Sequence, residues 1–301
     1  MQIGITGGTG FVGQHLIPLL SSRGHSVTVF SRSRNSKNVN GARLAHWDPE
    51  AGVYDTEAFT PLDAVVHLAG AGVADKRWTE ARKAEIVNSR VQGTRLLVDA
   101  LRKHASGCKT FVSASATGWY GADEAGKIPF SEDAPPAPDF LGETCRQWEA
   151  EAFCARDFLR TVALRIGIVL GHEGGAYPEF TKGLRFGVLP ILGSGTQVVS
   201  WVHVDDVAAM FARALEDETM HGVYNCVAPH PVPHRSLMQA LAKSKGGLAI
   251  PVPVPAFALK IGLGEMSIEV LKSCTVSADK VKAAGFRFRF ERIEEAAKDL
   301  A

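Results

Sequence analysis

The sequence TGGTGFVG at residues 6–13 decides the fold of this chain. It follows an apolar, β-branched run at 2–6 and precedes an amphipathic stretch, an order that predicts a strand, a tight loop and a helix over about 11–23. The spacing of its glycines allows a sharp turn, a close approach to a pyrophosphate and tight packing of the helix against the strand. The free N–H groups and the positive dipole end of the helix favour phosphate. The residues expected to bind a dinucleotide here are Gly7, Thr9, Gly10, Phe11, Val12 and Gly13.

The alternation of strands and helices continues through the first 170 residues. Short apolar runs rich in β-branched residues alternate with longer amphipathic stretches, which is the pattern of βαβ units and of a parallel sheet. We therefore expect an α/β fold, a doubly wound Rossmann sheet, over residues 1–170. The further expected strands lie at 25–31, 64–70, 110–116 and 160–171, and the further helices at 80–104 and 142–156.

The second half of the chain has a different pattern of residues. Residues 171–199 are rich in glycine, which indicates loops, after which 201–217 predicts a strand followed by a helix and 222–228 another strand. We interpret residues 200–228 as rejoining the Rossmann sheet. Residues 171–199 plus 229–301 then form a smaller, discontinuous domain on the substrate side.

The end of the second strand selects the kind of dinucleotide. In NAD-binding domains a carboxylate at this place holds the ribose 2′-hydroxyl, but here the chain has Ser31 and Arg32, and no Asp or Glu before Asp48. A guanidinium beside a small hydroxyl suits a 2′-phosphate, which it can hold by charge-assisted hydrogen bonds. Arg34 and Lys37 add positive charge nearby. We therefore predict NADP(H) as the cofactor; the alternative is that these residues form a solvated basic loop.

Composition sets limits on partners and compartment. The formal net charge is +1 and no aromatic and basic stripe is present, which argues against nucleic acid as a partner. No apolar run approaches the ~18 residues of a membrane span. The five cysteines lack a Cys-x-x-Cys pair, so neither a disulfide framework nor a metal site is expected. Because a strand begins directly after Met1, we expect no signal peptide and a cytoplasmic protein.

Several strings resemble the extended short-chain dehydrogenase/reductase superfamily, the group of nucleotide-sugar epimerases. Besides the glycine motif they are HLAG (67–70), VQGT (91–94), VSASATGWYG (112–121) and WVHVDDVA (201–208). Longer strings resemble the atypical "epimerase family" branch, notably DKRWTEARK (75–83) and AAGFRFRF (283–290). The resemblance covers nearly the whole chain. It implies cofactor contacts from Leu68, Ala69, Gly70, Arg90, Ser115 and Arg165.

The proton-transfer residues of that superfamily are missing. The superfamily uses a Tyr-x-x-x-Lys pair, in which the lysine lowers the pKa of the phenol while hydride moves to or from the nicotinamide. By the family's spacing, the two positions fall near Leu141 and Cys145, and neither residue can replace the pair. The residues four positions after the four tyrosines are Ala58, Glu124, Thr181 and Ala228, so the pair exists nowhere in the chain.

Ser115 and Tyr120 are the candidates for catalysis. The resemblance places Ser115 at a strand end that faces the nicotinamide and Tyr120 on the loop that follows. A free phenol has a pKa of about 10 and needs a cationic partner to act as an acid, for which Arg90 and Arg77 are available. The alternative is that the Tyr120 ring packs beneath the loop while its hydroxyl finds a backbone partner. For Cys145 we expect inert packing.

Two classes of function remain open. The first is an NADP-dependent oxidoreductase or epimerase that acts on a small polar molecule bound between the two domains. The second is a non-catalytic NADP(H)-binding sensor or scaffold, which the missing tyrosine and lysine favour. Helix residues Glu143 and Glu149 are expected on an exposed face and at a helix terminus. Because the superfamily often pairs through such helices, a homodimer through 80–104 and 142–156 is a further expectation.

Overall fold

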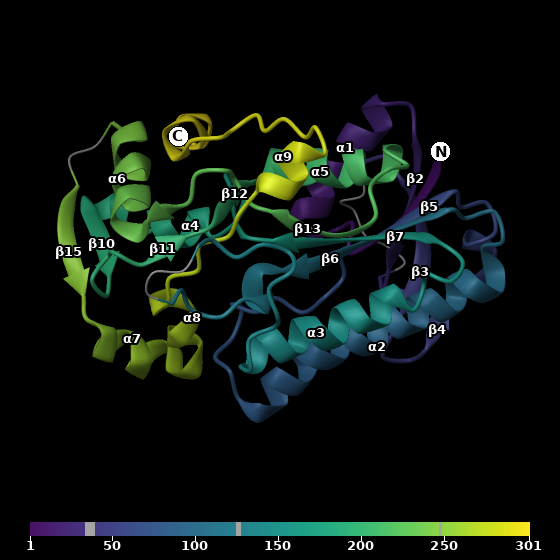
Figure 1. Ribbon diagram of the computed structural model, residues 1–301, viewed down its shortest axis with the longest axis horizontal. Coiled ribbons are helices and arrows are strands. Elements are labelled where there is room, and N and C mark those ends of the chain that lie inside the picture. The colour runs from purple at the N-terminus through teal and green to yellow at the C-terminus, as the bar shows by residue number, and fades with distance from the viewer. Residues whose placement is uncertain (34–39, 125–127, 247–248) are drawn as a thin grey trace.

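A twisted sheet of mostly parallel strands forms the centre of the molecule (Figure 1). The computed structural model describes residues 1–33, 40–124, 128–246 and 249–301, so Arg34 and Lys37 lie outside the described residues. Within them, the strand order of this sheet is β13-β7-β6-β5-β1-β2-β3-β4, and only β4 runs antiparallel to its neighbour. The strands are β1 (Gln2–Thr6), β2 (Ser26–Ser31), β3 (Arg43–Asp48), β4 (Val53–Tyr54), β5 (Ala64–His67), β6 (Thr110–Ala116), β7 (Arg160–Ile166) and β13 (Gly222–Cys226).

Helices cover both faces of this sheet, which confirms the doubly wound Rossmann fold (Figure 1). On one face lie α1 (Phe11–Ser22) and α5 (Val204–Glu216), which pack against each other. On the other face lie α2 (Glu80–His104) and α3 (Phe140–Phe153), side by side. Each helix pair encloses its own apolar cluster with the sheet. The strands between them are buried on both faces, as their continuous apolar runs predict.

The chain leaves and re-enters this sheet on the way to its C-terminus. The predicted strand at 160–171 is divided at Gly167, since β8 (Ile168–Gly171) pairs with β12 (Trp201–His203) in a separate three-stranded sheet with β9 (Gly174–Gly175). A Cβ atom at Gly167 would lie 2.5 Å from the Ser200 carbonyl oxygen, so the backbone segments at residues 167 and 200 approach each other more closely than a side chain would allow. Residues 200–228 were expected to rejoin the main sheet, but within this range only β13 does so, by pairing with β7, because β12 pairs with β8 in the separate sheet.

The remaining elements gather around a third apolar cluster at the opposite end of the molecule from β3 and β4 (Figure 1). β10 (Val188–Leu192) pairs in parallel with β15 (Ile250–Val254), and α6 (His234–Ser244) packs on β10. The other elements of this part are β11 (Val198–Val199), β14 (Val232–Pro233), α4 (Tyr177–Thr181), α7 (Ala256–Leu263), α8 (Ser267–Leu271) and α10 (Ile293–Asp299), with the short 3-10 helices η3 (Gly183–Phe186) and η4 (Gly264–Met266). Three further elements lie at the Rossmann sheet: α9 (Asp279–Ala283) packs against β13, η1 (Thr56–Ala58) lies between β4 and β5, and η2 (Thr117–Trp119) follows β6. None of the helices in the described ranges combines the length and the apolar character needed to cross a membrane.

Candidate functional site

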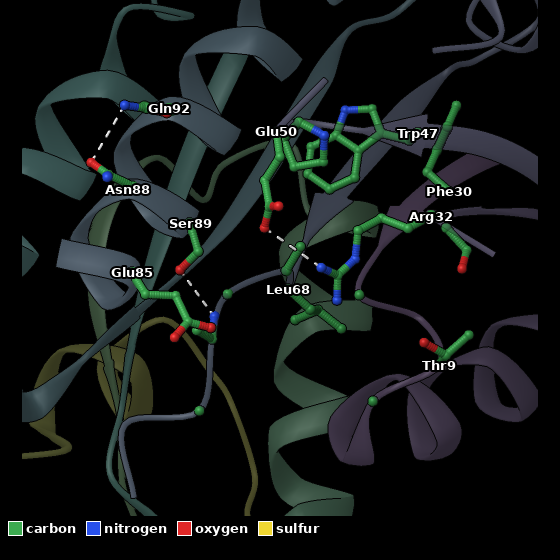
Figure 2. A pocket seen from close by; sticks show the side chains of 18 of the residues that line it. Thr9, Phe30, Arg32, Trp47, Glu50, Leu68, Glu85, Asn88, Ser89 and Gln92 are labelled. Carbon is green, nitrogen blue, oxygen red and sulfur yellow. Dashed lines mark hydrogen bonds and ion pairs between the residues drawn. The ribbon is translucent and has the colours of Figure 1, made fainter. Parts of the chain in front are cut away.

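A groove of about 1250 Å³ opens at the carboxyl ends of β1, β2 and β5 (Figure 2). This is the edge of an open α/β sheet at which ligands bind, where the strand order reverses on either side of β1. The glycine loop forms one side of the groove and α2 forms the opposite side. Of the residues expected to bind the cofactor, the groove is lined by Gly7, Thr9, Gly10, Ser31, Arg32, Leu68, Ala69 and Gly70.

Three of the four glycines in TGGTGFVG, Gly7, Gly10 and Gly13, meet different neighbours. Gly7 has a φ of +71°, and a Cβ atom there would lie 2.7 Å from the backbone nitrogen of Ala69. At Gly13 a Cβ atom would lie 2.4 Å from the carbonyl oxygen of Gly8, so the first turn of α1 packs against the loop too closely for any side chain at this position. Among the described residues, a Cβ atom at Gly10 would meet only the Gly7 carbonyl oxygen, at 3.2 Å. These residues therefore leave space above Gly10, as a closely approaching pyrophosphate requires.

The amino end of α1 supplies free hydrogen-bond donors to this space. Gly10 is the N-cap residue, no side chain caps the helix, and no acidic residue stands in its first turn. The first N–H groups of the helix and its positive dipole end therefore remain available to an anion. The Phe11 ring packs away from the groove, since Cβ atoms at Gly171 and Gly174 would collide with it. Neither Phe11 nor Val12 lines the groove, and the side chain of Val12 packs against the apolar cluster, so a cofactor contact from either residue remains a prediction.

The far end of the groove combines an apolar wall with charge. Trp47, within β3, and Pro49, directly after it, line this end. The sequence pattern did not predict β3, because its alternation is short. Arg32 follows β2, and its side chain is 70% exposed. Its Nη1 atom lies 3.7 Å from Oε1 of Glu50 (Figure 2). A purine ring suits the Trp47 and Pro49 wall, and a phosphate suits Arg32.

Helix α2 holds the loop after β5 in place. The Ser89 hydroxyl accepts a hydrogen bond from the backbone nitrogen of Ala71 at 3.0 Å. Arg90 donates from Nη1 to the carbonyl oxygens of Ala71 and Ile86, at 2.9 and 3.1 Å. Burial lowers the pKa of Arg90 below its ordinary value. Arg90 does not line the groove, so the structure places it as a support for the loop, and direct contact with a cofactor remains a prediction.

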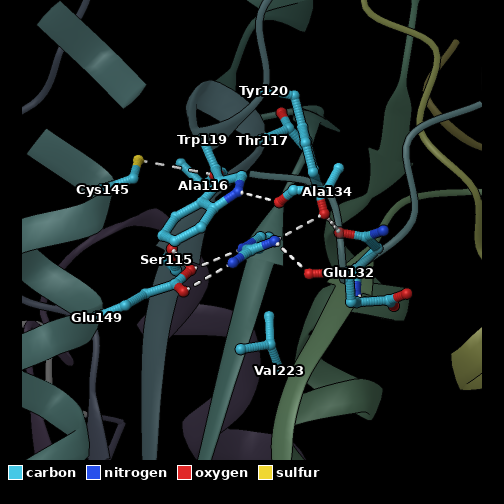
Figure 3. A network of polar contacts seen from close by, with 12 residues as sticks. Ser115, Ala116, Thr117, Trp119, Tyr120, Glu132, Ala134, Cys145, Glu149 and Val223 are labelled. Atoms are coloured by element: carbon cyan, nitrogen blue, oxygen red, sulfur yellow. Dashed lines mark hydrogen bonds and ion pairs between the residues drawn. The ribbon is translucent and has the colours of Figure 1, made fainter. Parts of the chain in front are cut away.

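The two catalytic candidates lie in a separate, buried network (Figure 3). The Ser115 hydroxyl donates to Oε1 of Glu149 at 2.6 Å. Arg165 donates from Nε and Nη2 to the two carboxylate oxygens of Glu149, at 2.8 and 2.9 Å. The Tyr120 hydroxyl accepts from Nη1 of Arg165 at 3.0 Å and donates to Oδ1 of Asn225 at 2.7 Å. The network thus joins three strands, one helix and the loop after β6.

Strand register explains why these side chains meet. β6 pairs with β7 so that Ser115 lies beside Arg165, and β7 pairs with β13 so that Arg165 lies beside Asn225. Three consecutive strands therefore present a hydroxyl, a guanidinium and an amide in one row across the sheet. Helix α3 places Glu149 over that row, and the loop after η2 places Tyr120 over it.

This network corrects two expectations from the sequence. Glu149 is buried and paired with Arg165, with 5% of its side chain exposed, rather than lying at a helix terminus. The cation beside Tyr120 is Arg165 rather than Arg90 or Arg77. The partner of Arg165 is invisible in the sequence because residues 149 and 165 lie on different elements, and only the packing of α3 on the sheet brings them together.

The chemistry of Tyr120 is accordingly that of a packed residue. Its ring is fully buried and stacks on Phe130, with ring centroids 5.1 Å apart. Burial raises the pKa of Tyr120 to about 12, against the opposing effect of Arg165. Burial also raises the pKa of Cys145 to about 12, so its thiol is not activated. None of Ser115, Tyr120 and Arg165 lines the groove, so the structure does not bring them into the candidate dinucleotide site.

The groove also contains residues that the sequence analysis did not select. Asn88 and Gln92 line it from α2, together with Glu85. Asp75 and Lys76 line it beyond Gly72. Helical spacing offered a signal for the first group, because residues 85, 88, 89 and 92 recur at three- and four-residue intervals on one face of α2. The loop residues had no such periodicity.

Fold and groove together define a Rossmann protein with a dinucleotide-type site at the glycine loop of its first strand. The model of the NAD dependent epimerase/dehydratase family matches residues 3–226, and the chain belongs to this family. A second model, for a domain of unknown function, matches residues 254–300.

The chain is similar over its full length to proteins of the epimerase family branch, which confirms the resemblance seen in the sequence. It is 35% identical to the epimerase family protein YfhF of Bacillus subtilis, covering 100% of this chain and 98% of that protein. A crystal structure of the human epimerase family protein SDR39U1 (isoform 2) with NADPH is 30% identical, with a TM-score of 0.88 over 100% of this chain and 99% of that one. UDP-glucose 4-epimerase from Thermotoga maritima, solved with UDP-glucose, is 26% identical, with a TM-score of 0.80 over 99% and 96% of the two chains.

Proposed function

We propose that this protein binds NADP(H) in the groove at the glycine loop. The observation that carries the proposal is the space above Gly10 at an uncapped helix terminus, with the Arg32 guanidinium at the far end of the same groove. The first feature suits a pyrophosphate and the second a 2′-phosphate. The crystal structure of human SDR39U1 with NADPH supports the same assignment.

The residues of the groove fit the parts of such a cofactor. The backbone N–H groups of Phe11 and Val12 would hold the pyrophosphate, Arg32 the 2′-phosphate, and Trp47 with Pro49 would pack on the adenine. The loop at residues 69–72, which hydrogen bonds from α2 hold in place, would line the groove between the adenosine and the rest of the cofactor. When bound, NADP(H) supplies a hydride donor or acceptor.

The buried network supports a non-catalytic use of the bound nucleotide. The hydroxyl proton of Ser115 is donated to Glu149, and that of Tyr120 to Asn225. The buried ion pair between Arg165 and Glu149 holds the hydroxyls of Ser115 and Tyr120 inside the protein, because each hydroxyl hydrogen-bonds to one member of the pair. Neither hydroxyl belongs to a residue that lines the groove, and burial raises the pKa of Tyr120, which makes it a poor proton donor for hydride transfer. We therefore favour an NADP(H)-binding sensor or scaffold.

The second candidate is an oxidoreductase or epimerase that acts on a small polar molecule. The observation in its favour is the charged end of the groove, where Asp75, Lys76 and Glu85 line the space beyond the glycine-rich loop 70–72. Such groups suit a polar substrate beside a cofactor. Under this alternative, proton transfer would use one of these groups or water instead of Ser115 and Tyr120.

Turnover with NADPH separates the two candidates. The purified protein would be incubated with NADPH and a panel of carbonyl compounds while nicotinamide absorbance is followed. The proposed function predicts saturable NADPH binding with no oxidation above the rate of a Gly10→Val variant. Oxidation that depends on the protein and is lost in that variant would establish the enzyme instead. Absence of NADPH binding would contradict both candidates.

A further inference from the structure

Arg32 and Glu50 face each other at the far end of the groove, beside Trp47 and Pro49 (Figure 2). Arg32 comes from the end of β2 and Glu50 from the turn between β3 and β4, and both line the groove. The distance from Nη1 to Oε1 is 3.7 Å, so the two charges form an ion pair. The side chains are 70% and 82% exposed. The pair therefore lies at the place where we expect the 2′-phosphate of NADP(H).

The backbone of Glu50 is held while its side chain stays free to turn. Asp48 accepts hydrogen bonds at Oδ1 from the backbone nitrogens of Glu50 and Ala51, at 3.0 and 3.2 Å. This is the side-chain-to-backbone turn typical of aspartate. The carboxylate of Glu50 thus stays within reach of Arg32, although an exposed side chain can swing aside at small cost.

We propose that Glu50 is a specificity-determining residue that opposes the 2′-phosphate at Arg32 and narrows the preference for NADPH over NADH. The inference rests on the proposed function. A 2′-phosphate that pairs with Arg32 must displace the Glu50 carboxylate and then lies near its negative charge. In NAD sites the carboxylate that accepts the ribose 2′-hydroxyl stands at the end of the second strand, whereas Glu50 reaches the same end of the groove from the turn between β3 and β4. The chain thus carries a cation for one cofactor and an anion for the other, on opposite sides of the groove.

Another carboxylate in the groove does not act in this way. Glu85 lies 2.7 Å from Nη1 of Arg82 and also lines the groove. Its hydrogen bond with Arg82 lowers the pKa of Glu85 below the ordinary range. The charge of Glu85 is therefore compensated chiefly by Arg82, with smaller contributions from Lys76 and Arg32, whereas Glu50 pairs directly with the guanidinium that the phosphate would use.

The test compares the ratio of the NADH and NADPH dissociation constants in three proteins. These are the wild type, Glu50→Gln and the control Glu57→Gln, which removes an exposed carboxylate from η1, outside the residues that line the groove. Removal of the Glu50 charge should raise the ratio about two- to fivefold at low salt, chiefly through tighter NADPH binding, because exposed charge pairs have small energies. The control should leave the ratio unchanged. The gain should shrink at ~1 M salt, where the Debye length is about 3 Å.

Each outcome bears on a definite claim. An unchanged ratio in Glu50→Gln, or weaker NADPH binding, with tight binding by the wild type, would overturn the role of Glu50 alone. An equal rise in Glu57→Gln would overturn it too, because the effect would then follow net charge and not position. Failure of the wild type to bind either nucleotide would overturn the proposed function and this inference together.

Discussion

Replacement of Glu149 by glutamine tests the structural role of the buried network. The substitution keeps the size of the side chain and removes its charge. The Glu149 carboxylate accepts one hydrogen bond from Ser115 and two from Arg165, and only 5% and 2% of the Glu149 and Arg165 side chains are exposed. In Glu149→Gln the Arg165 guanidinium would stay buried without a counter-charge.

The expected cost follows from that burial. Removing one partner of a buried ion pair costs about 3 to 5 kcal/mol, since the remaining charge has lost its compensation. We expect the free energy of unfolding of Glu149→Gln to fall by this amount. NADPH binding by the folded variant should be little changed, because Glu149 does not line the groove. The double variant Glu149→Leu with Arg165→Met should recover much of the loss, since it removes both charges.

Urea denaturation measures this difference, with Glu143→Gln as the control. Glu143 lies on the same helix and pairs with Arg146, but both side chains are about half exposed, so its replacement should change stability little. A loss below about 1 kcal/mol in Glu149→Gln would refute the reasoning, because it would mean that water reaches Arg165. Loss of NADPH affinity with full stability would instead place the network in the cofactor site.

Two further predictions follow from the loop and from a buried histidine. Gly10→Val should leave the unfolding temperature nearly unchanged and weaken NADPH binding at least ~10-fold. Gly13→Ala should instead destabilise the fold by about 1 to 3 kcal/mol, because its Cβ atom would lie 2.4 Å from a backbone oxygen. Calorimetry and nucleotide titration of both variants check this, and equal changes in stability and in NADPH affinity for the two variants would contradict it. Burial, with a smaller effect of the Arg90 charge, lowers the pKa of His67 to about 3. His67 therefore contributes stability that is fully present above about pH 6.5 and lost as the pH falls toward 3. The stability difference between wild type and His67→Gln, from urea denaturation, should narrow from pH 7 to pH 4.5, and a constant difference would show that His67 does not titrate as buried.

Local sequence patterns predicted most of the Rossmann half. The expected helix at 80–104 and the strand at 110–116 agree with α2 and β6 residue for residue. Both ranges were recognised from their patterns of apolar residues. Helix α2 begins after the N-cap residue Thr79, whose side chain accepts a hydrogen bond from the backbone nitrogen of Arg82. The strand β3 was missed because its alternation of buried Ala45 and Trp47 with the polar residues His46 and Asp48 extends over only four residues.

The buried network lay beyond prediction from sequence for a different reason. Its members come from β6, β7, β13 and α3, and the register of three strands brings Ser115, Arg165 and Asn225 into one row. Register depends on the pairing of strands far apart in the chain, which local periodicity does not encode. The resemblance to dehydrogenases predicted that Ser115 and Arg165 lie at strand ends, but not that Glu149 covers them.

Titration of the wild type and Arg32→Ala with NADPH and with NADH tests most directly whether the groove is an NADP(H) site. Nucleotide fluorescence would give the dissociation constants, and thermal stabilisation would check them, since a ligand at 100 times its dissociation constant adds ~2.7 kcal/mol of stability. We predict that the wild type prefers NADPH and that Arg32→Ala loses about 10- to 100-fold in NADPH affinity while NADH affinity changes little. Equal loss for both nucleotides would contradict the assignment of Arg32 to the 2′-phosphate. Absence of binding by the wild type would contradict the assignment of the groove itself.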